Sequence, residues 1–168
     1  MPTTTTPTEE HQARWQDIVA DPALQDLPYK VETNRRGQLV LRPHKNWHSF
    51  TQETVSDLLR EHAPEGSTPP EFAIATPEGV KAPDVIWVSP QRKREMEATG
   101  DPTALAPEIC VEVMSDSNDW AEMDEKRALY RDAGAEEVWI VTQDGDVRFF
   151  ADEEMEASEI APDFPHQI

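Results

Sequence analysis

Three ionisable residues, Asp84, Glu112 and Lys126, stand at positions where the neighbouring sequence favours apolar side chains. Burying one charge alone is costly, whereas placing opposite charges at one site makes their burial tolerable. Two close carboxylates repel each other, and a hard divalent cation such as Mg²⁺ relieves that repulsion. A nearby lysine can orient or help deprotonate an attacking water, or stabilise developing negative charge. The three residues are therefore candidates for a metal-assisted hydrolytic site.

Two adjoining elements must position Glu112 and Lys126. The short apolar run from Ile109 to Met114 predicts a buried strand with Glu112 in its middle. A polar turn rich in helix-capping residues follows, and it predicts a helix from about Asp119 to Ala133 that ends at a glycine. At about 100° per residue, Lys126 falls on the apolar face of this helix. The other residues of that face are Met123, Tyr130 and Ala133.

Asp84 lies near the start of a third predicted element, a strand over residues 81–88 in which Pro83 is confined to the beginning. If this strand and the Glu112 strand are neighbours in one sheet, the two carboxylates converge on one cavity. Mg²⁺ typically takes one or two protein carboxylates and keeps several waters, which fits this pair.

The remaining sequence predicts a single domain over residues 8–168, preceded by a disordered tail over residues 1–7 that is rich in Thr and Pro. A chain of 168 residues is long enough for one domain that buries roughly two-thirds of its unfolded surface. Helices are expected over residues 8–19 and 47–62, a hairpin over 29–41, and strands over 72–75, 137–141 and 147–150. Residues 89–107 form a long insertion, and the acidic C-terminal segment 151–168 carries apolar residues that can pack on the domain or on a partner subunit: Ile160, Phe164 and Ile168.

Several motifs occur in order along the chain: Pro83-Asp84, Val111-Glu112-Val113 with Ser115, Glu125-Lys126, the spacing from Tyr130 to Gly134, and the run from Glu137 to Val141. Together they resemble the Uma family of restriction-endonuclease-like proteins, over about residues 29–150. The resemblance implies a PD-(D/E)XK nuclease fold, an α/β domain whose central mixed β-sheet is flanked by helices. The D/E-x-K pattern would place its lysine at Met114, and the resemblance implies that Lys126 on the helix takes that role.

The same resemblance implies a metal-dependent endonuclease that hydrolyses phosphodiester bonds, with DNA as its substrate. Asp84 and Glu112 would bind Mg²⁺ or Mn²⁺ together with the backbone carbonyl of Val113. Lys126 would position the hydrolytic water. Dimerisation is common in this fold, and a homodimer would provide the two sites that double-strand cleavage needs.

Five further residues are candidates for accessory roles. His48 opens a helix and Glu32 precedes a turn, as residues of these types do in the family, but a packed or capping histidine and an exposed strand carboxylate are the alternative interpretations. A basic cluster at the start of the insertion is a candidate for phosphate contacts, and a solvated loop or a short exposed helix is the favoured interpretation because three basic residues are few. This cluster comprises Arg92, Lys93 and Arg94.

The charge of the chain works against nucleic-acid binding. The net charge is −19, and the residues from Glu108 onward carry 18 acidic and 4 basic side chains. Affinity for nucleic acid depends on cations that meet phosphates, so non-specific binding should be weak and salt-sensitive. Alternatively, the acidity serves solubility or reflects a saline host. A single cysteine, Cys110, and the lack of a signal-like or membrane-spanning run predict a cytoplasmic protein without membrane contact.

Two alternatives to a DNA endonuclease stay open. The acidic surface and the missing in-line lysine are consistent with a catalytically inactive nuclease-fold protein that acts as a protein-interaction module. In that case Asp84, Glu112 and Lys126 form a buried ionic cluster of purely structural use. A hydrolase of small phosphate esters would share the same metal site.

Overall fold

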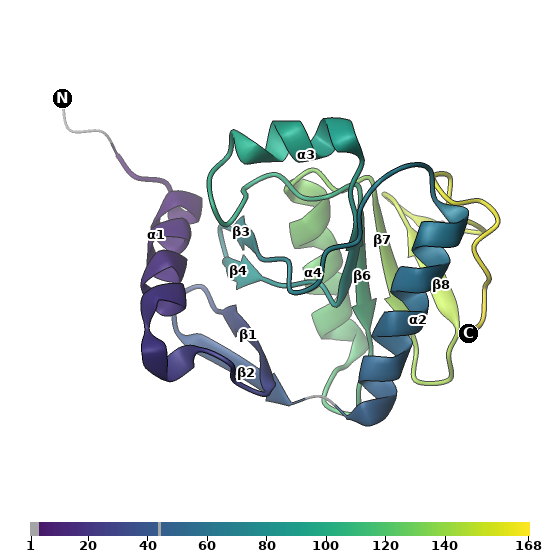
Figure 1. Ribbon diagram of the computed structural model, residues 1–168, viewed down its shortest axis with the longest axis horizontal. Coiled ribbons are helices and arrows are strands. Elements are labelled where there is room, and N and C mark those ends of the chain that lie inside the picture. The colour runs from purple at the N-terminus through teal and green to yellow at the C-terminus, as the bar shows by residue number, and fades with distance from the viewer. Residues whose placement is uncertain (1–3, 44) are drawn as a thin grey trace.

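The computed structural model describes residues 4–43 and 45–168 (Figure 1). Its helices are α1 (Pro7–Ala20), the short 3-10 helix η1 (Pro22–Leu24), α2 (Asn46–His62), α3 (Pro90–Glu97) and α4 (Trp120–Asp132). Its strands are β1 (Tyr29–Thr33), β2 (Leu39–Pro43), β3 (Ile74–Thr76), β4 (Gly79–Lys81), β5 (Val85–Trp87), β6 (Ile109–Val113), β7 (Glu137–Val141), β8 (Val147–Phe150) and β9 (Glu154–Met155).

The central element is a five-stranded mixed sheet in the order β5-β6-β7-β8-β9. Only β6 and β7 run parallel, as expected for two strands joined by the crossover helix α4, and the other pairs are antiparallel. Every residue of β6 and β7 is buried, which explains their nearly continuous apolar sequences. The sequence prediction of a central mixed sheet flanked by helices is therefore confirmed.

Helices α2 and α4 cover opposite faces of this sheet (Figure 1). Val111 and Val113 of β6 pack in one core cluster with Val55 and Leu59 of α2. Cys110 of β6 packs in the other cluster, which includes Met123 and Tyr130 of α4. Because side chains alternate along a strand, Glu112 lies on the Cys110 side and faces α4.

Two small sheets complete the domain beside the central one. β1 pairs with β2 as the predicted hairpin, and β3 pairs with β4. In Figure 1, α1, β1 and β2 lie together on one side of the molecule, while α2 and the C-terminus lie on the other. None of the helices in the described ranges is long and apolar enough to cross a membrane.

The predicted strand over residues 81–88 is wrong as a single element. β4 ends at Lys81 in one sheet and β5 begins at Val85 in another. Pro83 between them has no N–H to donate to a strand ladder, and the N–H of Ala82 donates instead to the Glu32 carboxylate at 2.7 Å. The break leaves Asp84 at the entrance of β5, beside the end of β6.

Four other segments refine the sequence prediction. The strand expected over residues 72–75 is β3, two residues further along, and the insertion contains the eight-residue helix α3. The acidic C-terminal segment packs on the domain, with the Phe164 ring 4.6 Å from that of Trp139 between their centroids. At the other terminus, Thr6 caps α1 through the N–H of Glu9, and residues 1–3 of the expected tail lie outside the described residues.

Candidate active site

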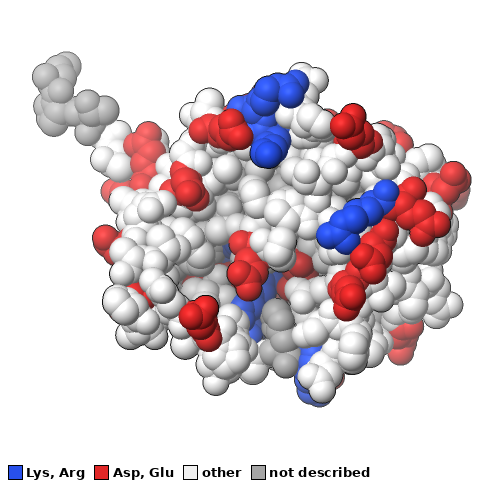
Figure 2. Space-filling model, in the orientation of Figure 1, with Lys and Arg blue, Asp and Glu red and all other residues white. Residues whose placement is uncertain are grey.

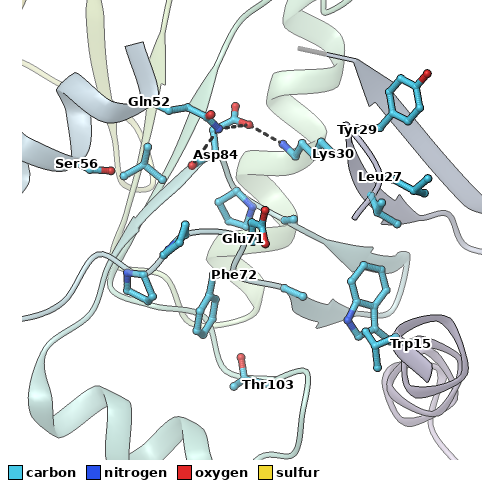
Figure 3. Close-up of a pocket in the computed structure, with 18 of the residues that line it drawn as sticks. Trp15, Leu27, Tyr29, Lys30, Gln52, Ser56, Glu71, Phe72, Asp84 and Thr103 are labelled. Carbon is cyan, nitrogen blue, oxygen red and sulfur yellow. Dashed lines mark hydrogen bonds and ion pairs between the residues drawn. The ribbon is translucent and has the colours of Figure 1, made fainter. Parts of the chain in front are cut away.

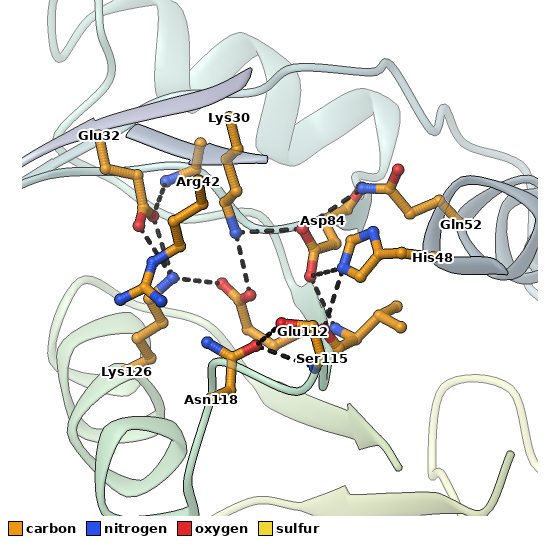
Figure 4. A network of polar contacts seen from close by, with 12 residues as sticks. Lys30, Glu32, Arg42, His48, Gln52, Asp84, Glu112, Ser115, Asn118 and Lys126 are labelled. Atoms are coloured by element: carbon orange, nitrogen blue, oxygen red, sulfur yellow. Dashed lines mark hydrogen bonds and ion pairs between the residues drawn. The ribbon is translucent and has the colours of Figure 1, made fainter. Parts of the chain in front are cut away.

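The carboxylates of Asp84 and Glu112 converge on one point, and the ammonium of Lys30 occupies it (Figure 4). Lys30 Nζ lies 3.1 Å from Asp84 Oδ1 and 3.1 Å from Glu112 Oε2. Only 2% of either carboxylate side chain is exposed, and 10% of Lys30. The two acidic residues predicted from different strands therefore meet, with a lysine of β1 between them.

Asp84 is held by contacts to both neighbouring elements. Its Oδ2 accepts a hydrogen bond from the backbone N–H of Val113 at 2.7 Å, which ties the start of β5 to the end of β6. From α2, Gln52 Nε2 donates to Oδ1 at 3.3 Å, and His48 Nε2 lies 3.4 Å from Oδ2. Burial opposes ionisation, but the Lys30 ammonium, His48 and the Val113 N–H together hold the pKa of Asp84 well below its usual value.

Glu112 is anchored from α4. Its Oε1 accepts a 2.6 Å hydrogen bond from the Tyr130 hydroxyl and lies 3.3 Å from Lys126 Nζ. Burial raises the pKa of Glu112, although Lys126 and Lys30 oppose that rise. Burial and the Glu112 charge in turn raise the pKa of the Tyr130 hydroxyl, so this phenol stays protonated and donates.

Lys126 reaches the site from the inner face of α4, where the sequence prediction placed it. Its ammonium lies 3.0 Å and 3.1 Å from the two oxygens of Glu32, as well as near Glu112. The interpretation of Glu32 as an exposed strand carboxylate is wrong, because only 3% of this residue is exposed. Burial would raise the pKa of Glu32, but Lys30 and Lys126 outweigh it and lower that pKa.

His48 and Val113 contact each other. His48 Nε2 lies 3.0 Å from the carbonyl oxygen of Val113, and only 4% of His48 is exposed. A carbonyl can only accept, so Nε2 is the donor. His48 thus lies beside Asp84 at the end of β6, and the Val113 carbonyl expected as a metal ligand accepts its hydrogen bond.

The donor atoms at this point suit a hard divalent cation. Asp84 Oδ1 and Glu112 Oε2 are carboxylate oxygens aimed at a common position, and Mg²⁺ typically takes one or two such ligands. Among residues 4–43 and 45–168, no group of three or more His, Cys, Asp or Glu side chains is arranged to hold a metal ion. Lys30 also occupies the common position, so a metal ion fits here only after this ammonium has moved.

A cavity of about 780 Å³ opens beside Asp84 and Lys30 (Figure 3). The aromatic side chains of Trp15, Tyr29 and Phe72 line it. The cavity is also acidic, and among the described residues that line it Lys30 is the single Lys or Arg. The acidic residues of its lining are Asp26, Glu53, Glu71, Asp84 and Asp101.

The basic cluster of the insertion does not join this site. Arg92 is half-buried, and its Nη1 donates to the carbonyl oxygens of Ala106 and Gly134 at 2.7 and 2.9 Å. Lys93 and Arg94 are exposed on α3. Ser89, the N-cap of α3, donates its N–H to Glu108, which precedes β6. Glu112 lies near the opposite end of β6, so α3 begins at the other end of that strand from the site.

Sequence reasoning missed the part that Lys30 and the Tyr130 hydroxyl take in this site. Lys30 and Glu32 alternate with Tyr29 and Val31 in β1, and a strand with charges at every second position usually turns them to solvent. Here that face lies against the end of the central sheet. Tyr130 was expected on the apolar face of α4. A buried tyrosine O–H needs a hydrogen-bond acceptor, so a tyrosine predicted on a buried face near a buried carboxylate was the signal for this contact.

Comparisons with known proteins agree with this architecture. The sequence profile of the Uma2 family, described as "Putative restriction endonuclease", matches residues 21–165. A crystal structure described as "a putative nuclease belonging to DUF820" from Anabaena variabilis superimposes with a TM-score of 0.59 and 14% sequence identity, over 74% of each chain. At that identity the likeness shows the fold alone. No curated protein sequence matches the chain. The match over most of its length shows that this chain belongs to the Uma2 family of putative restriction endonucleases.

Proposed function

We propose that this protein is a metal-dependent endonuclease that hydrolyses phosphodiester bonds in DNA. The observation that carries the proposal is the convergence of Asp84 Oδ1 and Glu112 Oε2 on one buried position, with Lys126 ion-paired to the same glutamate. A nuclease agrees with the restriction-endonuclease description of the family. The metal, the DNA substrate and the cytoplasmic location are parts of the proposal.

Each residue of the site has a separate task in this proposal. Asp84 and Glu112 would hold Mg²⁺ or Mn²⁺, which when bound would lower the pKa of a water and offset the charge of the phosphate. The Val113 N–H and the Tyr130 hydroxyl each hold one oxygen of a carboxylate, which leaves the other oxygen pointing at the position that Lys30 Nζ occupies. Lys126 positions the attacking water, a role that requires its ammonium to exchange one of its carboxylate contacts for that water.

The β1–β2 hairpin restricts access to these residues. It contributes Lys30 and Glu32 to the site, and Arg42 of β2 forms an ion pair with Glu122 of α4. Close by, Lys45 pairs with Asp116 of the loop after β6. The pocket that reaches Glu112 and Lys126 directly has a volume of only about 20 Å³. A phosphodiester would therefore enter through the cavity beside Asp84 or after the hairpin has moved.

The surface offers little attraction to a polyanion. Figure 2 shows acidic side chains scattered over the visible face and basic ones in small separate groups, one of them over α3. With a net charge of −19, the protein should bind DNA weakly and with strong salt dependence, so metal ions contribute to holding the phosphate. Two copies of the chain would be needed to cut both strands at one position.

Cleavage of plasmid DNA with Mg²⁺ or Mn²⁺ tests the proposal. We expect nicking by the native protein, loss of nicking in Glu112→Gln and Asp84→Asn, and native activity in Glu61→Gln, which removes an exposed carboxylate of α2. Circular dichroism checks that each variant is folded. Absence of cleavage of DNA and RNA by folded native protein with either metal would contradict the proposal.

A protein-interaction module is the second candidate, because the ammonium groups of Lys30 and Lys126 already form ion pairs with the buried carboxylates of Glu32, Asp84 and Glu112. In that case Mn²⁺ would not bind, and a partner complex would survive Lys126→Met.

A hydrolase of small phosphate esters is favoured instead by the 780 Å³ cavity, which falls in the size range of small-molecule sites. Hydrolysis of p-nitrophenyl phosphate by a protein that leaves DNA intact would select that activity.

A further inference from the structure

Lys30 takes the position that a divalent cation would take between the two carboxylates. Its Nζ is equidistant, at 3.1 Å, from Asp84 Oδ1 and Glu112 Oε2. Lys30 belongs to β1, whereas Asp84 precedes β5 and Glu112 lies in β6, so 54 and 82 residues separate it from its two partners. The tertiary fold alone therefore brings this ammonium to the site.

The remaining oxygens of the two carboxylates are already engaged by other donors. Asp84 Oδ2 accepts from the Val113 N–H, and Glu112 Oε1 accepts from the Tyr130 hydroxyl and contacts Lys126. These contacts do not involve Lys30. Removal of its ammonium would thus leave two fixed oxygens aimed at one vacated position, which is the geometry that a hard cation requires.

The charges of the cluster favour replacement of the lysine by a divalent ion. The carboxylates of Glu32, Asp84 and Glu112 face the ammonium groups of Lys30 and Lys126, which leaves one excess negative charge among these side chains. A divalent ion in place of the Lys30 ammonium would bring the sum to zero. A monovalent ion would bring no such gain, so the exchange selects for divalent cations.

The cavity beside the site can receive the displaced side chain. Lys30 lines the cavity of about 780 Å³ (Figure 3), and its flexible four-carbon stem allows the ammonium to turn toward that space. The carboxylates of Glu71 and Glu53 line the same cavity. A displaced ammonium would therefore find room and acidic side chains within this cavity.

We propose that Lys30 is a built-in competitor for the metal site, whose ammonium leaves the Asp84–Glu112 position when a divalent cation binds. The inference rests on the proposed function, because it concerns the cation of that same site. It makes Lys30 a specificity-determining residue: it neutralises the carboxylates while no metal is bound and sets the affinity that a metal must exceed.

Calorimetric titration of Mn²⁺ and Mg²⁺ tests the competition directly. Lys30→Met should bind the metals tighter than the native protein by about tenfold or more. Lys30→Arg, which keeps the charge, should not gain affinity, and neither should Lys45→Met, which removes an ammonium that is 71% exposed. The double variant Lys30→Met with Glu112→Gln should lose the binding. Equal affinity of native protein and Lys30→Met, with binding lost in Glu112→Gln, would overturn the role of Lys30 and leave the proposed metal site intact.

Chemical labelling of the native protein gives a second measurement that does not depend on the variants folding. Acetylation of lysines, followed by peptide mass spectrometry, should show Lys30 protected without metal and several-fold more reactive at saturating Mn²⁺. Lys93, which is exposed on α3, serves as the internal standard and should not change. Unchanged Lys30 reactivity at saturating metal, or absence of metal binding in every variant, would overturn the inference, and the DNA cleavage assay would judge the nuclease proposal separately.

Discussion

The hydroxyl of Tyr130 donates a 2.6 Å hydrogen bond to Oε1 of Glu112, which joins α4 to strand β6 of the central sheet at a buried carboxylate. Tyr130 is completely buried, and Glu112 is 2% exposed. Water therefore cannot replace this donor without a change in packing. The contact fixes the orientation of the Glu112 carboxylate, whose other oxygen, Oε2, points at Lys30.

Tyr130→Phe should destabilise the fold. Loss of a donor to a buried charged acceptor costs about 1–3 kcal/mol of unfolding free energy, which urea denaturation measures. Tyr29→Phe is the matched control, because Tyr29 is 43% exposed and its change should stay within about 0.5 kcal/mol. Equal effects of the two substitutions would contradict the anchoring role of Tyr130.

Lys126 and Glu32 should be strongly coupled in stability. Lys126→Met leaves the Glu32 carboxylate buried without this partner, and removal of one partner of a buried ion pair costs about 3–5 kcal/mol. Glu32→Gln removes the opposite charge, so the double variant should lose less stability than the sum of the single ones. A double-mutant cycle by urea denaturation should give a coupling of about 0.5–3 kcal/mol. Additive losses would show that the pair is not a unit.

The contribution of Asp84 to stability should disappear in acid. Its pKa is lowered in the folded state, so its contribution is fully present above the unfolded value of about 3.9 and declines as the pH falls below that value. The difference in unfolding free energy between native protein and Asp84→Asn should therefore be largest above about pH 4 and shrink toward pH 2. Asp57→Asn, at an exposed position, should show a small difference throughout. A gap for Asp84→Asn that stays constant with pH would contradict this assignment.

Arg92 should matter for stability and Lys93 should not. Arg92→Ala removes two hydrogen bonds to the carbonyls of Ala106 and Gly134, so thermal and urea denaturation should show a loss of about 1–3 kcal/mol. Lys93→Ala, one position away on the exposed side of α3, should leave stability within about 0.5 kcal/mol.

The Lys93→Ala variant also tests whether this cluster contacts phosphates. DNA binding measured against salt concentration should lose slope in Lys93→Ala if Lys93 neutralises a phosphate, because each such contact releases counterions. An unchanged salt dependence of DNA binding in Lys93→Ala would support the interpretation of this cluster as part of an exposed helix.

The local sequence determined the strand–helix unit at the centre of the site. The apolar run around Glu112 and the period of α4 were sufficient to predict a buried strand and a helix with Lys126 on its inner face, and both predictions are confirmed. The strands expected over residues 137–141 and 147–150 are likewise present as β7 and β8. These features depend on short-range periodicity and turn chemistry, which a sequence carries directly.

Tertiary structure alone decided which charges meet. Lys30 and Glu32 have the alternation of a solvent-exposed strand, yet the β1–β2 hairpin folds that face against the end of β6. The pattern of a strand shows that two side chains share a face but not what covers that face. Likewise, residues 81–88 do not form the single strand expected of them. They are divided between β4 and β5, because the N–H of Ala82 donates to the carboxylate of Glu32, 50 residues away. The sequence therefore predicted the carboxylates of the site, and the fold supplied the ammonium that lies between them.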